Sequence, residues 1–207
     1  MLLGNYSAAL HGAGGVAAGA DSRGLLLVKG NASDGKKIGW SENFVLSLTV
    51  TIEEHKSLSR LIGGGGNGVL TADGTLVFPV QATKKKATGE GTAEKAVSLV
   101  LHSSDPAGTW RLSKGMSAEG CSSPSVVAWE DNKLFMMAAC EDGRRRVYES
   151  DDKGETWTEA LGTLSRVWGD APARGGPDVQ SGFITALIDE RRVLLVTLPL
   201  HSGENGK

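Results

Sequence analysis

Residues 150–157 read SDDKGETW, a composition typical of a tight corner between two β-strands. The pattern S-x-D-x-G-x-T-W is made by Ser150, Asp152, Gly154, Thr156 and Trp157. The serine and aspartate carry short oxygens that bond nearby backbone N–H groups, and the glycine permits a positive φ. The threonine and tryptophan begin a new strand with a large apolar anchor. Because the preceding residues 144–149 also have a strand-like pattern, the sequence predicts a hairpin corner here.

A second copy of this corner lies upstream, where residues 103–110 read SSDPAGTW. The matching places are held by Ser103, Asp105, Thr109 and Trp110. Alanine replaces the glycine, so this copy is degenerate. We therefore expect the two tryptophans to hold the same structural position in consecutive repeats. A spacing of roughly 40–50 residues is what a four-stranded propeller blade needs.

The strands expected around the two corners follow one order in each repeat. A short strand turns into a second, a third strand leads into the corner, and a polar excursion at residues 84–95 is the main difference between the copies. The blades are expected to divide as residues 61–113 with the degenerate corner, 114–160 with the intact corner and 161–207 as a partial blade. Two full blades with partial ones beside them cannot close a ring, so we expect the chain alone to expose strand edges.

Four short stretches need a separate interpretation. Residues 63–68 read GGGGNG, but no Gly-Lys-Ser/Thr and no helix follows, which argues against a phosphate-binding loop. We expect these glycines to let an inner strand enter the crowded propeller axis. Residues 24–29 and 36–40 are expected to form a hairpin, and residues 53–56 a short helical turn.

The composition excludes several classes of function. The chain has 207 residues, a formal charge of -2 and a pI near 6.1, which gives no reason to expect nucleic acid or an anionic membrane as a partner. No apolar run approaches the ~18 residues of a membrane span, and the first residues lack the basic start of a signal peptide. Two cysteines and four scattered histidines provide no zinc spacing, so no metal or other cofactor is expected.

Two pairs of residues concern covalent modification. Cys121 and Cys140 flank an expected hairpin and could form a disulfide, although two separate buried thiols are an equal alternative because a small shift in strand register decides between them. Asn5 and Asn31 begin N-x-S sequons, which are glycosylation sites only in a secreted chain.

Taken together, several blocks resemble the trypanosome trans-sialidase superfamily. The S-x-D-x-G-x-T-W corner resembles the Asp-box of sialidases. The further blocks are GTLVFPV at 74–80, LSKGMS at 112–117, GC at 120–121, PSVV at 124–127, RRRVYES at 144–150 and GTLSRVWG at 162–169. The likeness is strong over residues 60–200 and weaker over 1–60. It implies an all-β fold, namely part of a six-bladed sialidase-type propeller.

The resemblance also implies a chemistry for active members. They remove or transfer sialic acid with a tyrosine nucleophile, because a carboxylate nucleophile would be repelled by the carboxylate of the sugar. Three arginines grip that carboxylate, a glutamate takes the proton of the tyrosine, and an aspartate acts as acid and base. The implied partners are sialylated glycans or host-surface glycoproteins, and the implied location is the cell surface or the exterior.

Two of these catalytic positions are changed in this sequence. Active members carry the glutamate in a Cys-x-Glu-Pro run, and the same place here holds Ser123. They carry one arginine nine residues before the tyrosine of the RRxVYES run, and counting back from Tyr148 gives Ala139. No other catalytic residue is recognised in the chain. We therefore predict an inactive, adhesin-like relative. The alternatives are a sialidase or trans-sialidase whose catalytic residues lie elsewhere, and a truncated product without function.

Two groups of side chains could be mistaken for sugar-binding residues. Arg144, Arg145 and Arg146 lie on an expected third strand, where charged groups usually face solvent, so we do not assign them to the sugar carboxylate. Four tryptophans, Trp110, Trp129, Trp157 and Trp168, could also be taken for sugar-stacking residues. The repeat places Trp110 and Trp157 between blades, so packing is expected for these two. The corner residues are accordingly expected to be structural.

Overall fold

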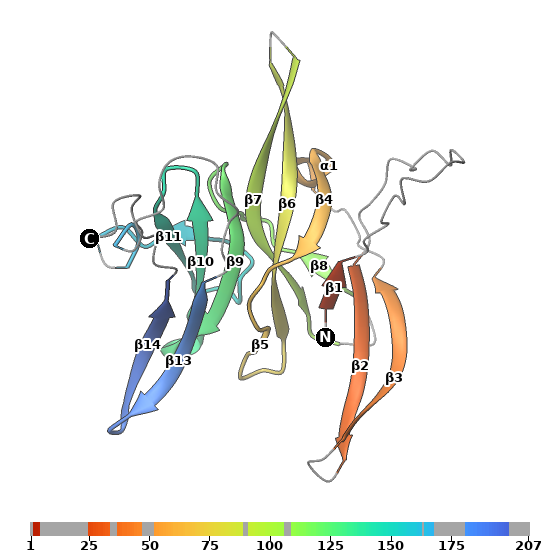
Figure 1. The fold of residues 1–207 in the computed structure, drawn as a ribbon, viewed down its shortest axis with the longest axis vertical. Coiled ribbons are helices and arrows are strands. Elements are labelled where there is room, and N and C mark those ends of the chain that lie inside the picture. Colours follow the sequence, from red (N-terminus) through yellow and green to blue (C-terminus); the bar gives the residue numbers. More distant parts are fainter. Residues whose placement is uncertain are drawn as a thin grey trace, which may run out of the picture.

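The computed structural model describes residues 2–4, 25–33, 37–46, 52–88, 91–105, 109–162, 164–167 and 181–198. Nearly all of the described secondary structure is β-strand, in four antiparallel sheets that stand side by side (Figure 1). The helical pieces are the single turn α1 (Glu53–Lys56) and the 3-10 turn η1 (Glu130–Asn132). No helix among these residues is long and apolar enough to cross a membrane.

The two central sheets contain the repeated pattern. The first, here called the β4–β8 sheet, consists of β4 (Leu58–Gly63), β5 (Val69–Leu70), β6 (Leu76–Thr88), β7 (Gly91–Ser103) and β8 (Arg111–Leu112). The second, the β9–β12 sheet, consists of β9 (Cys121–Ala128), β10 (Leu134–Cys140), β11 (Arg145–Ser150) and β12 (Thr158–Glu159). In both sheets the strand order follows the sequence order, with β5 pairing to β6 beside β4. Each third strand, β7 or β11, leads into a corner, as the sequence predicted.

Two smaller sheets flank the central pair (Figure 1). One contains β1 (Leu2–Gly4), β2 (Leu25–Ser33) and β3 (Lys37–Leu46), and the other is the hairpin of β13 (Gly182–Ile188) and β14 (Arg191–Thr197). The predicted strands at residues 24–29 and 36–40 fall in β2 and β3, which form a hairpin, but the two segments do not face each other. Residues 25–29 pair with 42–46, and residues 37–40 pair with 30–33, so the turn lies later than predicted. The predicted helical turn at residues 53–56 is confirmed as α1.

The polar excursion at residues 84–95 is part of the sheet rather than a departure from it. Antiparallel pairing continues from Lys84 opposite Lys95 to Thr88 opposite Gly91, so β6 and β7 form one long hairpin. The paired ends of β6 and β7 extend beyond the neighbouring strands (Figure 1). Backbone ladder bonds do not require buried side chains, which is why a lysine-rich sequence without an apolar face still pairs here.

Apolar side chains fill the spaces between successive sheets. Val77 and Val100 of the β4–β8 sheet form one buried cluster with Leu134, Met136 and Tyr148 of the β9–β12 sheet. A second cluster joins the other face of the β9–β12 sheet to Phe183 of the β13–β14 hairpin. The sheets therefore pack face to face in chain order, as propeller blades do.

The two corner tryptophans pack in this interior. Trp110 is 2% exposed and its ring centroid lies 5.8 Å from that of Phe78. Trp157 is half-buried against the cluster between the two central sheets. The surroundings of both tryptophans thus favour a packing role over sugar stacking. Trp168, the last tryptophan of the chain, lies outside the described residues.

The solvent-facing interpretation of residues 144–146 is wrong for one arginine. Arg144 is exposed, but Arg145 is only 8% exposed. Arg145 and Val147 share one face of β11, where Val147 packs with Ala160 and Leu164 of the segment after β12. The same segment runs along the edge of β11, with the Arg166 N–H donating to the Arg145 carbonyl at 2.9 Å. Burial of the arginine follows from this later segment, which a single strand pattern does not reveal.

Candidate functional site

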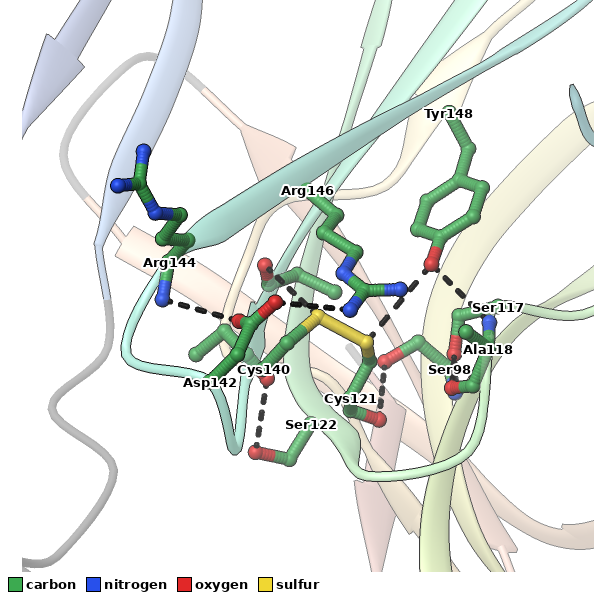
Figure 2. The surroundings of a disulfide bond; sticks show 12 residues. Ser98, Ser117, Ala118, Cys121, Ser122, Cys140, Asp142, Arg144, Arg146 and Tyr148 are labelled. Carbon is green, nitrogen blue, oxygen red and sulfur yellow. Dashed lines mark hydrogen bonds and ion pairs between the residues drawn. A yellow bond between two sulfur atoms is a disulfide. The ribbon is translucent and has the colours of Figure 1, made fainter. Parts of the chain in front are cut away.

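The two changed positions, Ser123 and Ala139, lie on adjacent strands at one end of the β9–β12 sheet. Ala139 in β10 pairs with Ser122 in β9, and the next pair along is Cys140 opposite Cys121. The structure joins these two cysteines in a disulfide, with a Cα–Cα distance of 4.0 Å (Figure 2). The hairpin that carries both positions is therefore closed covalently beside them.

Ser123 sits in a β-bulge. The strands are in register at Ser122 opposite Ala139 and again at Ser125 opposite Met137, so two residues of β9 face a single residue of β10 between these pairs. Ser123 has a φ of 51°, a left-handed conformation that is uncommon for a side chain other than glycine. Bulges of this kind redirect a side chain, and they are frequent at functional sites.

A polar contact from the neighbouring sheet holds the bulge. The Ser123 N–H donates to the side-chain oxygen of Gln81 in β6, at 2.9 Å. Two residues further along β9, the Ser125 hydroxyl donates to the Ser181 carbonyl at 3.2 Å. Three successive sheets thus meet at the start of β9. Gln81 was not singled out in the sequence; the signal that could have found it is a lone amide in the apolar run of residues 76–82, the first half of β6.

The glycine-rich residues 63–68 pack against this same part of β9. A Cβ atom added to Gly64 would lie 2.7 Å from the Pro124 carbonyl oxygen, and one added to Gly66 would lie 3.0 Å from the Ser125 Cα atom. Such distances leave no room for a side chain. The glycines are therefore needed for the close approach of two backbones, in line with the predicted entry of an inner strand into a crowded region.

The charged side chains nearest the disulfide are engaged with one another (Figure 2). Arg146 donates to Asp142 at 2.8 Å. Partial burial acts to raise the pKa of Asp142, but the hydrogen bonds from Arg146 and from the Arg144 N–H outweigh it and leave that pKa below its usual value. Because Arg146 is engaged by Asp142 in the preceding turn, we do not assign it as a replacement for an arginine at position 139.

Tyr148 is buried, and its hydroxyl lies against the disulfide. Its hydroxyl accepts a hydrogen bond from the Ala118 N–H at 3.0 Å and lies 3.7 Å from the Cys121 sulfur. Burial raises the pKa of Tyr148, so the phenol remains protonated near neutral pH. Both features give this tyrosine a packing role.

The intact corner lies at the other end of the same sheet. Ser150 is paired with Leu134, the first residue of β10, whereas Ala139 is near its last residue. The Asp152 carboxylate accepts from the Ser150 hydroxyl at 2.7 Å and from the Thr156 N–H and hydroxyl at 2.9 and 2.6 Å. Gly154 has a φ of 86°. These bonds close the corner on itself and engage the side-chain oxygens of Ser150, Asp152 and Thr156.

The degenerate corner keeps part of this network. The Ser103 hydroxyl accepts from the Asp105 N–H at 3.1 Å, and its single proton can be donated to either the Asp105 or the Thr109 carbonyl, at 2.6 and 2.9 Å. Its serine thus bonds to the backbone of the turn, as Ser150 does to the Gly154 N–H at 2.9 Å.

The structure describes only one of the two N-x-S sequons. Asn31 is exposed in β2, whereas Asn5 lies outside the described residues. Within the described part of the chain, no group of three or more His, Cys, Asp and Glu side chains is placed to hold a metal ion.

At Ser123 and Ala139 themselves, the side chains offer one hydroxyl and one methyl group, so neither a proton transfer from tyrosine nor a bidentate grip on a carboxylate can be made there.

Comparison with known proteins gives relatives of one kind. A family model described as BNR repeat-like domain matches residues 1–207. A sialidase of Trypanosoma cruzi is 38% identical over 143 residues, which are 69% of this chain and 12% of the relative. Sialidase 85-1.1 of the same organism is 38% identical over 168 residues, 78% of this chain and 21% of the relative. This chain therefore spans at most about a fifth of these two proteins.

A solved structure gives the same result for the fold. Trypanosoma rangeli sialidase in complex with the inhibitor DANA matches with a TM-score of 0.68 and 35% identity, over 86% of this chain and 28% of that chain. The predicted all-β, sialidase-type propeller segment is confirmed. The chain belongs to the BNR repeat-like domain family and, within it, to the sialidase and trans-sialidase superfamily, of whose β-propeller it forms a part.

Proposed function

We propose that this chain is part of a catalytically inactive, adhesin-like glycoprotein that acts at the cell surface or outside the cell. The observation that supports the proposal is the side chains at Ser123 and Ala139, which lie together on one hairpin end where active members have a glutamate and an arginine. Removing one preorganised polar group from such a site typically lowers kcat by ~10²–10³. Because both the glutamate and the arginine are replaced, we do not expect efficient turnover of a sialoside.

The proposed partners are sialylated glycans or host-surface glycoproteins. Trypanosoma rangeli sialidase has been solved in complex with sialic acid, and it is 34% identical to this chain. A propeller that lost its chemistry can retain sugar binding, because binding and transition-state stabilisation rest on partly different contacts. Exposure of Asn31 is compatible with a glycosylated chain.

The first test is the hydrolysis of a fluorogenic sialoside by the protein. We expect no release of the fluorophore above background. Release that is abolished by DANA would overturn the proposal in favour of the alternative, an exo-α-sialidase or trans-sialidase whose remaining catalytic groups lie elsewhere.

The second test concerns adhesion. Cells that display the protein are expected to adhere to sialylated target cells, and to lose adherence after the targets have been stripped of sialic acid. A matched display of Gln81→Leu, which removes the side chain that holds the Ser123 bulge, is expected to adhere less. Equal adherence to untreated and stripped targets would count against a sialylated partner.

A further inference from the structure

A cavity of about 390 Å³ lies at the end of the sheets opposite Ser123 and Ala139. It opens between the β5–β6 turn, the β9–β10 turn and the start of β14, which lie at the same end of the molecule (Figure 1). Its volume is within the ~300–1,000 Å³ that small-ligand sites usually have. Neither Ser123 nor Ala139 is among the residues that line this cavity.

The β9–β10 hairpin supplies six of the ten lining residues, four of them from its turn. The Trp129 N–H donates to the Lys133 carbonyl at 2.7 Å, and the Lys133 N–H donates to the Glu130 carbonyl at 3.0 Å. Between them Asp131 and Asn132 have φ values of 55° and 60°, so this is a tight turn with two left-handed residues in succession. The turn fixes a tryptophan beside a row of polar side chains.

These polar side chains have no partner among the described residues. Glu130, Asp131 and Asn132 are exposed, and their side chains form no hydrogen bond or ion pair with another residue that the structure describes. Arg192, which reaches the cavity from β14, has none either, although Arg146 and Arg166 each pair with a carboxylate. The cavity thus combines an aromatic ring with unused donors and acceptors.

The aromatic part is only partly covered. Trp129 is half-buried and packs on Phe135, with the ring centroids 6.2 Å apart, while another part of it borders the cavity. Leu70 at the rim is 63% exposed. A partly exposed indole next to carboxylate, amide and guanidinium groups suits a ligand with an apolar ring face and hydroxyl groups around it.

We propose that this cavity is a second carbohydrate site, which binds a neutral hexopyranose stacked on Trp129 and hydrogen-bonded to Asp131, Asn132 and Arg192. The lining has two carboxylates and one guanidinium, a net formal charge of -1, which disfavours an acidic sugar. The inference goes beyond the function proposed above and does not depend on it, since the site, its residues and its ligand class are all different.

The test measures binding of neutral methyl glycosides to the protein. Saturation-transfer NMR with the methyl glycosides of galactose, glucose, mannose and N-acetylglucosamine is expected to detect at least one ligand. The double variant Asp131→Gly/Asn132→Gly keeps the left-handed turn, because glycine adopts positive φ without strain. It is expected to weaken that binding about tenfold or more, the effect of losing two hydrogen bonds to the ligand.

A matched control comes from another tight turn, the one between β13 and β14. Asp189 and Glu190 have φ values of 48° and 61° and are not part of the cavity lining. The variant Asp189→Gly/Glu190→Gly makes the same backbone change and removes two carboxylates, yet should bind as the wild type does. Equal affinity of the cavity variant and the wild type, or no binding of any neutral glycoside, would overturn the proposal.

The methyl glycoside of N-acetylneuraminic acid distinguishes the two proposals. Its binding, if it occurs at the sialoside site, is expected to be unchanged in Asp131→Gly/Asn132→Gly. Loss of sialoside binding in this variant would show that the cavity binds an acidic sugar despite the net formal charge of -1 of its lining, and would contradict the proposed preference for a neutral sugar. Failure of sialoside binding alone would leave the neutral-sugar site standing.

Discussion

Gly115 and Trp157 are in backbone contact across the two central sheets. A Cβ atom added to Gly115 would lie 2.8 Å from the Trp157 backbone nitrogen, and the Gly115 N–H donates to the Glu155 carbonyl at 2.9 Å. The corner of the β9–β12 sheet is thus seated directly on the chain that leaves the β4–β8 sheet. Spacing between the sheets at this point is set by a residue with no side chain.

The first prediction is that Gly115→Ala destabilises the protein. The added methyl group meets backbone atoms, which cannot move aside as a flexible side chain can, so we expect a loss of roughly 1–3 kcal/mol in the free energy of unfolding. Gly39→Ala is the control, because the nearest atom to its Cβ would be 3.9 Å away. Urea unfolding of both variants would measure the difference; equal midpoints would show that the sheets are not held together here.

The second prediction concerns Asp152. Partial burial acts to raise its pKa, but the hydrogen bonds from Thr156 and Ser150 outweigh it and leave that pKa below the usual value. A carboxylate with a lowered pKa in the folded state stabilises the fold above its unfolded pKa, near ~3.9, and this stabilisation is lost as the pH falls through the folded pKa. The corner should therefore weaken in acid, below about pH 4.

Replacement of the aspartate tests this directly. Asp152→Ala is expected to cost about 1–3 kcal/mol at pH 7, since the charged acceptor of three hydrogen bonds is removed, and less at pH 3. Asp151→Ala is the control, because that side chain is 77% exposed and only pairs with Lys133 at 3.5 Å. Thermal unfolding at the two pH values gives both numbers. A cost for Asp152→Ala that does not change with pH would argue against the ionised form.

How far the sequence predicts the structure depends on the range of the interactions. The strand order, both corners and the two central hairpins rest on local signals, namely turn residues and apolar runs, and these could be recognised. The bulge at Ser123 could not, because it depends on Gln81 in another sheet and on the approach of the glycine-rich residues 63–68. The face of β11 that carries Arg145 is likewise packed by Ala160 and Leu164, which belong to a later segment of the chain.

The site shows the same division. Ser123 and Ala139 were found by their place in a family pattern, and the strand pairing explains why they belong together. The cavity beside Trp129 has no motif, because its lining comes from three turns or strand ends that are far apart in the sequence. Sequence alone also left the state of the two cysteines open, since their pairing required the register of β9 against β10.

The third prediction is that removing the disulfide destabilises the hairpin end that carries Ser123 and Ala139. The bond joins Cys121 and Cys140, which are 19 residues apart in sequence. A loop of this size restricts the unfolded chain enough to contribute about 3 kcal/mol. Cys121→Ala/Cys140→Ala should lower the midpoint of urea unfolding, and dithiothreitol should lower that of the wild type but not of the variant. A reductant effect of equal size on both would contradict this assignment.

The last prediction concerns a histidine between the two central sheets. His102 in β7 is mostly buried, with its Nε2 atom 3.1 Å from a carboxylate oxygen of Glu155 in the following corner. Burial lowers the pKa of His102 below 6.5, and the Glu155 charge only partly opposes this. A histidine with a lowered pKa favours the fold while it is neutral. Its contribution is therefore complete above about pH 6.5 and is lost as the pH falls toward the folded pKa.

Stability should accordingly decline between pH 7 and pH 5, and His102→Gln should flatten this part of the profile. Glu155→Gln removes the charge that favours the protonated ring, so the His102 pKa should fall further and the loss of stability on acidification should become larger. NMR titration of the His102 ring gives the pKa directly in both proteins. A wild-type pKa above 6.5 would mean that the charge of Glu155, not burial, governs this contact between the sheets.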